Sequence, residues 1–365
     1  MSSVRLRRGT VLRVLDERPG ALELEIEVEG ERVPAIAYPD LVGPVGEGDA
    51  VLLNTTARSL GLGTGGMDLV VAVAGGGAVD LGDVGRVMKA RYTPLQAAVR
   101  SVEETHREAL EGSSGLAGTP VVCAPLHSMV GPIAAGARVA GAERVVYVMT
   151  DGAGLPGAFS RQVPRLRGAG MLAASITCGQ AFGGDLEAVT IWSGLLAAVE
   201  VAEADVVVVA DGPGNLGTDT TWGVSALASG EALNAVHVLG GAPVAALRVS
   251  FADERERHRG VSHHTLTILD RVCTGEVNVA VPALEGANRD AVWDALRRRS
   301  LEERHQLVET DGRPALDELD RAGIEPESMG RTPGDDPAFF LAAGAAGVLA
   351  GRMAARAARW RPGNG

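Results

Sequence analysis

The feature that most constrains the fold is a run of four valines, Val206–Val209, which ends at Asp211 and leads into a glycine-rich loop. A short, uninterrupted apolar run bounded by turn-forming residues is typical of a strand that is buried on both faces of a parallel sheet. In open α/β sheets the ligand lies at the carboxyl ends of the strands. The loop that follows, residues 212–218, is therefore predicted to line a ligand site.

Apolar runs of the same kind recur along the chain and alternate with helix-like segments. Strands are expected at residues 120–124, 144–149, 175–178, 205–210, 244–249 and 277–281. This alternation predicts an α/β fold in which a doubly wound, mostly parallel, Rossmann-like sheet has helices on both faces. Capping and proline signals predict one helix from Thr93 to about Leu110 and a last helix from Pro337.

The first 75 residues have a different pattern. Leu22, Leu24, Ile26 and Val28 alternate with glutamates, which is the period of a strand with one face in water. Short strands punctuated by glycine predict a small all-β, barrel-like domain over residues 1–75. The glycines at 75–77 are the expected linker to an α/β domain over residues 78–365.

Bulk composition excludes several classes of function. The net charge of -12 argues against a nucleic-acid partner, and 3% aromatic residues leave few stacking platforms for bases. Three widely spaced cysteines without a CxxC pair fit a reducing cytoplasm, and no signal peptide is recognised. The Ala/Gly-rich run at 338–351 is too short for a membrane span, so a helix buried in the core or at a homo-oligomer interface is expected.

Polar residues gather directly after five of the expected strands, where a doubly wound sheet would bring them together. The candidate catalytic residues, proposed for acid and base roles, are Asp151, Asp211, His258 and His263. The candidate ligand-binding residues are His127, Ser128, Gly183, Gly184, Asp185, Gly212, Gly214, Gly217, Thr218, Asp253, Arg255, Arg257 and His264.

The segment from Asp253 to His264 is open to three interpretations. Arginines such as Arg257, together with a helix start capped by Ser262, would bind a phosphate or carboxylate. Neutral imidazoles with a carboxylate would ligate a transition metal, although the adjacent His263 and His264 are expected to point to different faces of a helix. The third interpretation is a structural or solvated segment.

These patterns favour an enzyme that acts on a small anionic metabolite carrying a phosphate or carboxylate group. A non-catalytic ligand-binding sensor or scaffold that oligomerises is one alternative. A metal-dependent hydrolase or lyase that uses the cluster His258/His263/His264 is another. No cofactor is assigned, because the chain has neither a P-loop lysine nor the GxGxxG spacing of a dinucleotide site.

Several motifs spread along the chain are specific enough in combination to indicate a family. They are Leu53–Ala57, Leu60–Gly66, Arg91–Gln96, Met149–Gly152, Ala181–Ala188, Ser250–Asp253, Arg257–Thr265, Met329–Arg331 and Asp336–Phe340. With these motifs the chain resembles an uncharacterised bacterial family, domain of unknown function 3866, nearly end to end. The resemblance implies no particular activity. It does imply a histidine where this chain has Gln180 and a glycine where it has Asp219, so a shared metal-binding or catalytic histidine at the first position is absent here.

Overall fold

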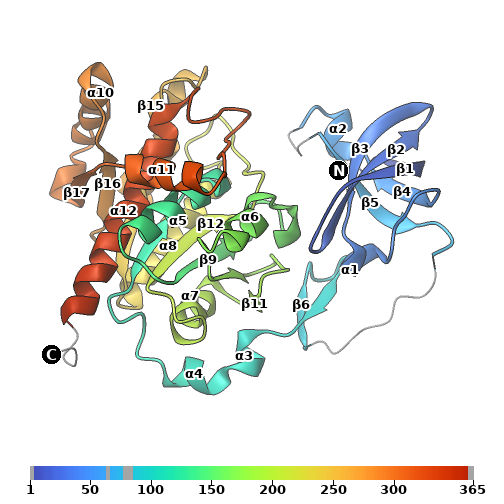
Figure 1. Cartoon of the computed structure of the whole chain (residues 1–365), viewed down its shortest axis with the longest axis horizontal. Helices are drawn as coiled ribbons and strands as arrows, with labels where there is room; N and C mark the ends of the chain where they lie inside the picture. The colour runs from blue at the N-terminus through green and yellow to red at the C-terminus, as the bar shows by residue number, and fades with distance from the viewer. Residues whose placement is uncertain (1–3, 63–65, 77–84, 361–365) are drawn as a thin grey trace. The chain divides into compact units, whose positions relative to one another are not determined.

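The computed structural model describes residues 4–62, 66–76 and 85–360, and it divides into two compact units, Met1–Val99 and Arg100–Gly365 (Figure 1). Gly77 of the expected linker and residues 63–65 of the Leu60–Gly66 motif lie outside the described residues. The domain boundary at 75–78 therefore stays a prediction.

The first unit contains a closed five-stranded barrel, as expected from its alternating sequence. Leu24, Ile26 and Val28 are buried in its core, whereas Glu27 between them is exposed. The barrel strands, in the order in which they pair, are β1 (Leu6–Arg18), β2 (Ala21–Val28), β3 (Glu31–Ala37), β5 (Asp68–Val73) and β4 (Ala50–Asn54). Two single-turn helices, α1 (Pro39–Val42) and α2 (Thr56–Ser59), connect strands of the barrel.

The prediction of a helix that begins at Thr93 is wrong. A short hairpin, β6 (Val87–Lys89) with β7 (Ala97–Val99), occupies this part of the chain. The side chain of Gln96 accepts a hydrogen bond from the backbone N–H of Tyr92 at 3.3 Å, and the Thr93 hydroxyl donates to the Ala90 carbonyl at 2.8 Å. These side chains therefore stabilise a turn instead of capping a helix. The helical residues come later, in α3 (Val102–Thr105) and α4 (Arg107–Gly112).

The second unit is built on an eight-stranded sheet in which every neighbouring pair is parallel. Its strands, in spatial order, are β11 (Leu186–Glu187), β10 (Ala174–Thr177), β9 (Val145–Thr150), β12 (Val206–Asp211), β8 (Pro120–Cys123), β13 (Ala242–Ala246), β16 (Asn278–Pro282) and β17 (Gln306–Thr310). The valine run of β12 lies near the centre of the sheet and is fully buried. The outermost strands, β11 and β17, have no continuous apolar run, so the sequence pattern does not predict them.

Helices cover both faces of this sheet, which confirms the doubly wound α/β architecture. Alternate valines of β12 belong to two separate cores: Val206 and Val208 pack with one set of helices, Val207 and Val209 with the other. On the first face lie α5 (Val130–Val139), α6 (Gln162–Gly168), α11 (Arg313–Arg321) and α12 (Pro337–Trp360). On the second face lie α7 (Ile191–Glu200), α8 (Ala228–Val238) and α10 (Gly286–Arg297).

The last helix, α12, begins at Pro337 as predicted and packs beside α5 and α11 (Figure 1). By length and composition it could span a membrane, but 78% of its apolar segment is buried inside the fold. Its glycines allow the approach to α5, since a Cβ added at Gly347 would collide with the carbonyl oxygen of Ile133. The Ala/Gly-rich run is thus a core helix in the second unit.

Candidate functional site

A pocket of about 150 Å³ opens at the carboxyl ends of β8, β12 and β13, near the middle of the sheet. The two adjacent strands β12 and β8 are followed in the chain by strands on opposite sides of them in the sheet: β8 is followed by β9 on one side, and β12 by β13 on the other. This is the topological switch point at which α/β sheets bind ligands. The lining residues are Pro125, Leu126, Asn215, Leu216, Gly217, Thr218, Val224, Ala226, Arg248, Arg255, Arg257, His258, Ser262, His264, Thr265 and Met329.

A small ribbon shapes the wall of the pocket. Strand β14 (Val249–Ser250) pairs with β15 (Gly260–Val261), so the intervening segment folds back as a closed loop. The backbone N–H of Asp253 donates to the Ser250 hydroxyl at 3.0 Å and fixes the start of this loop. Consequently Arg255, Arg257 and His258 come from a stretch anchored at both ends.

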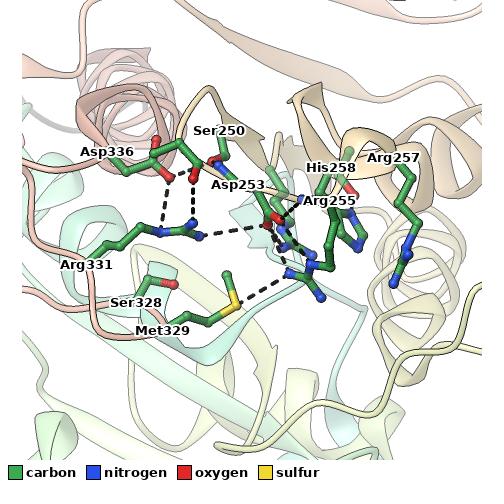
Figure 2. Close-up of polar contacts among 12 residues, drawn as sticks. Ser250, Asp253, Arg255, Arg257, His258, Ser328, Met329, Arg331 and Asp336 are labelled. Atoms are coloured by element: carbon green, nitrogen blue, oxygen red, sulfur yellow. Dashed lines mark hydrogen bonds and ion pairs between the residues drawn. The ribbon is translucent and has the colours of Figure 1, made fainter.

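The buried carboxylate of Asp253 is the centre of a charge cluster (Figure 2). Its carboxylate accepts two hydrogen bonds of 2.9 Å from the guanidinium of Arg255 and one of 3.0 Å from Arg248. Burial alone would raise the pKa of Asp253, but the two arginines hold it well below its usual range. Burial, partly offset by Asp253, lowers the pKa of Arg248 to about 10, so both groups stay charged at neutral pH.

A second acidic group extends this cluster towards the start of α12 (Figure 2). Arg331 lies 3.8 Å from Asp253 and 3.7 Å from Asp336, and Asp336 accepts a hydrogen bond of 2.6 Å from Ser250. The segment that carries Arg331 also holds Met329 at the pocket, where its sulfur is 3.7 Å from Arg255. The loops after β13 and before α12 therefore form one charged network.

The candidate residue Ser128 belongs to the same region but not to the pocket lining. It lies in the single turn that precedes α5, and its hydroxyl is 2.9 Å from that of Ser328. Ser128 therefore ties the start of α5 to the segment that carries Met329.

Three histidines converge beside the arginines. His258, His263 and His264 each offer one ring nitrogen, and these nitrogens all lie within 4.8 Å of one another. The expectation that His263 and His264 face apart is wrong, because their ring centroids are 3.8 Å apart. They begin the short helix α9 (His263–Thr267), where no preceding helical turn restricts their side-chain rotamers.

Burial disfavours the charged form of all three imidazoles. It lowers the pKa of His258 to about 3 and that of His264 to about 4, and the positive charge of Arg248 contributes in both cases. Burial also lowers the pKa of His263, with Arg257 as the next cause. The prediction that Ser262 caps α9 is wrong, because its side chain makes no capping hydrogen bond. Its hydroxyl lies 2.8 Å from Nδ1 of His258 instead.

The loop after β12 reaches the pocket through its second half. Gly217 and Thr218 line the pocket, and a Cβ added at Gly217 would lie 3.8 Å from the His264 ring. Gly212 and Gly214 are required by the backbone conformation of the loop. A side chain on Gly212 would collide with the Gly154 carbonyl, and Gly214 has a φ of +91°, which favours glycine. The loop does not enter a helix directly, because a single 3₁₀ turn, Ser225–Leu227, precedes α8.

Asp211 is buried behind the pocket wall. Its carboxylate accepts hydrogen bonds from Thr150 at 2.5 Å and from the Asn215 side chain at 2.9 Å. Burial raises the pKa of Asp211 although the hydrogen bond from Thr150 acts in the opposite direction. Asn215 also donates to the Pro125 carbonyl at 3.2 Å and lines the pocket, so Asp211 positions a pocket residue without lining the pocket itself.

His127 forms a neighbouring buried network. Its ring lies 3.1 Å from the Tyr147 hydroxyl and 2.8 Å from the Ser160 hydroxyl, and Tyr147 donates to the Asp211 carbonyl at 3.0 Å. Burial lowers the pKa of His127 to about 4. This imidazole supports the β8 and β9 strand ends and does not belong to the pocket lining.

Four other candidates lie towards the β10–β11 edge. Asp151 accepts a hydrogen bond of 2.7 Å from the Gln180 backbone, and Asp185 accepts two from Ser175 at 2.7 and 2.9 Å. Gly183 donates to Glu187 at 2.6 Å, and a Cβ on Gly184 would lie within 3.0 Å of backbone atoms of β10. The structure thus brings together the β8, β12 and β13 segments and leaves the β10 segment to the side.

Sequence reasoning missed several residues of the site. Arg248 was overlooked because it lies in an apolar run, yet a lone charge in such a run is itself a signal that a partner is buried nearby. Asn215 gave no signal beyond its place in a glycine-rich loop. Arg331 and Met329 were recognised only as part of a motif, since their distance along the chain hides their proximity to Asp253.

Comparisons with known proteins place the chain in a family without providing an activity. No significant match was found to any curated protein or to any solved structure. A family model described as "Protein of unknown function (DUF3866)" matches residues 34–347. Because this match covers most of the chain, and the resemblance in its motifs agrees with it, the protein belongs to the DUF3866 family.

Proposed function

We propose that the protein is an enzyme that binds a small metabolite carrying a phosphate or carboxylate group in the pocket at β8, β12 and β13. The observation that carries the proposal is that three guanidinium groups, Arg248, Arg255 and Arg257, line one pocket of about 150 Å³. Arginine donates several N–H groups in a planar array and suits the oxygens of phosphates and carboxylates.

The charge balance of the pocket supports an anionic ligand. Asp253 neutralises part of the charge of Arg248 and Arg255, while Arg257 pairs with Asp219, whose side chain is 83% exposed. Within the described residues, the buried Nε atoms of Arg248 and Arg257 have no hydrogen-bond partner. A buried donor without an acceptor costs free energy, so a ligand oxygen that accepts from one of them is favoured.

The rim of the pocket adds an apolar component. Leu216 is 73% exposed and Met329 is 56% exposed, and both line the pocket. Large apolar side chains in such positions suit the carbon skeleton of a ligand whose anionic group contacts the arginines. We also propose, as the sequence predicts, that the protein is cytoplasmic and that it forms a homo-oligomer.

A pair of matched variants tests anion binding. Arg257→Gln removes a pocket guanidinium, whereas Arg259→Gln removes the same charge from an exposed residue two positions along the loop. We expect inorganic phosphate, citrate or a sugar phosphate to raise the melting temperature of the wild type and of Arg259→Gln, and to raise that of Arg257→Gln much less. Equal shifts in all three proteins would show that the anions bind elsewhere.

A separate measurement distinguishes an enzyme from a sensor. The full-length protein is incubated with each metabolite that stabilises it, and the products are followed by mass spectrometry. Turnover that Arg257→Gln reduces and Arg259→Gln preserves supports the enzyme. Binding without turnover by any stabilising metabolite would instead leave the non-catalytic sensor as the function of this pocket.

A further inference from the structure

We propose that His258, His263 and His264 form a binding site for a divalent transition metal ion of the zinc type. The three ring nitrogens lie within 4.8 Å of one another, and His258 and His264 line the pocket. This inference concerns residues other than the pocket arginines and does not rest on the proposed anion binding.

Two of the three histidines have a buried ring nitrogen without a hydrogen-bond partner. Nε2 of His263 and Nε2 of His264 are buried and have no hydrogen-bond partner within the part of the chain that the structure describes. His264 as a whole is only 4% exposed. Buried imidazole nitrogens without a partner are unfavourable, and the two ring centroids are 3.8 Å apart, so one metal ion could be the partner of both rings.

A contact with Ser262 orients the imidazole ring of His258. Nδ1 of His258 lies 2.8 Å from the Ser262 hydroxyl, which leaves its Nε2 for a metal ion. Metal-binding histidines usually engage their other ring nitrogen in this way. Three nitrogens around zinc at about 2.1 Å would be about 3.4 Å apart, and the ring nitrogens of the three histidines lie within 4.8 Å of one another.

Three protein ligands leave a fourth position of a tetrahedral ion open. Zinc sites with three protein ligands are typical of catalytic centres, where water or substrate takes the remaining position. The nearby arginines repel a cation, and Asp253 offsets part of this charge through Arg248 and Arg255. A cation and an anion bound side by side would stabilise each other, and such coupling is reciprocal.

The test uses the full-length protein after chelator treatment, in a buffer without phosphate. Zinc chloride is titrated by calorimetry, and cobalt chloride is followed by the visible bands of tetrahedral cobalt. We expect one ion per chain and a cobalt spectrum with nitrogen ligands. Absence of saturable zinc and cobalt binding by the folded wild type would overturn the proposal whatever the variants do.

Variants locate the ion. His258→Gln and His264→Gln are expected to abolish the cobalt spectrum, and Ser262→Ala to weaken zinc binding about 10- to 100-fold. His237→Gln makes the same change at an exposed residue of α8 and should bind like the wild type. Circular dichroism of the chelated proteins checks folding, and undiminished binding by a folded His264→Gln would refute the site.

The two proposals fail separately. Arg257→Gln should keep the cobalt spectrum while losing the stabilisation by phosphate. If cobalt binds as expected but no anion stabilises the wild type, the metal site stands and the proposed function falls. If anions stabilise the wild type but neither metal binds, the metal site falls alone.

Discussion

At the scale of single residues, Asp253 determines how the site is held together. Its side chain is 3% exposed and contacts Arg248, whose side chain is 9% exposed. Two charges buried together are stable only as a pair, because each has lost its hydration. Removing one charge of the pair should therefore change both the stability of the fold and the net charge of the pocket.

Asp253→Asn should destabilise the protein by about 3–5 kcal/mol, because it leaves the Arg248 guanidinium buried without its counter-charge. The expected result is a lower midpoint in urea with an unchanged denaturant slope, measured at neutral pH. Because the pKa of Asp253 is depressed in the folded state, its contribution is present above its unfolded pKa of about 3.9 and is lost as the pH falls further. A change of less than about 1 kcal/mol would mean that the pair is solvated.

Asp219→Asn is the matched change at an exposed carboxylate. Asp219 lies 2.7 Å from Arg257 but is 83% exposed, so its loss should alter the free energy of unfolding by less than about 1 kcal/mol. It should also strengthen anion binding, because Arg257 no longer pairs with a carboxylate of its own chain. Calorimetry with phosphate checks this prediction, and weaker binding by the variant would contradict it.

His127 provides a pH-dependent contribution to stability. Its folded pKa of about 4 lies below the ordinary value of 6.5, so the unfolded chain binds the proton more tightly. The stabilisation is complete above pH 6.5 and is lost as the pH falls towards 4, in total about 3 kcal/mol. Urea unfolding across this range should therefore show a shallower pH dependence for His127→Gln than for the wild type. A pH dependence of His127→Gln identical to that of the wild type would exclude this role.

At the scale of elements, the sequence best predicts the helices and strands that are specified by a local pattern of residues. The buried valines of β12 and the start of α12 at Pro337 follow from apolar runs and proline preferences. The short edge strand β11 gave no such signal, since two residues show no period. The turn at Thr93 was misread because its side chains form hydrogen bonds that compete with helix capping.

The site was predictable only in part, for a related reason. The Asp253–His264 segment is dense in charged and imidazole groups, so its composition identified it. The convergence of His263 and His264 depends on side-chain rotamers at the first turn of α9, which spacing does not reveal. The contact of Arg331 with Asp253 joins residues that are far apart in sequence, and only the fold brings them together.

The packing of α12 on α5 gives a prediction for the element. Ala normally stabilises a helix interior relative to Gly by about 1 kcal/mol. At Gly347, however, the new Cβ would collide with the Ile133 carbonyl oxygen of α5, so Gly347→Ala should destabilise by about 1–3 kcal/mol. Gly168→Ala lies at the end of α6, where no atom of the described residues is within 4 Å of the added Cβ; it is the control and should be neutral or stabilising. Equal stability of the two variants in urea would mean that the two helices separate readily.

At the scale of the whole molecule, the described residues form three hydrophobic cores in two units. One core fills the barrel of Met1–Val99, and the other two lie on the two faces of the sheet in Arg100–Gly365. The described residues that line the pocket all belong to the second unit. The machinery for ligand binding therefore depends on the sheet and its loops, and the barrel has a core of its own.

This arrangement predicts two unfolding transitions in calorimetry, because units with separate cores need not unfold together. Leu53→Ala removes a fully buried side chain from the barrel and should lower one transition by the equivalent of about 2–5 kcal/mol. Gly347→Ala should lower the other. A stabilising anion should raise only the transition that Gly347→Ala lowers, since a ligand stabilises the unit that binds it. A single transition that shifts with both variants and with the anion would show that the two units unfold as one, which would make the barrel part of the stability of the site.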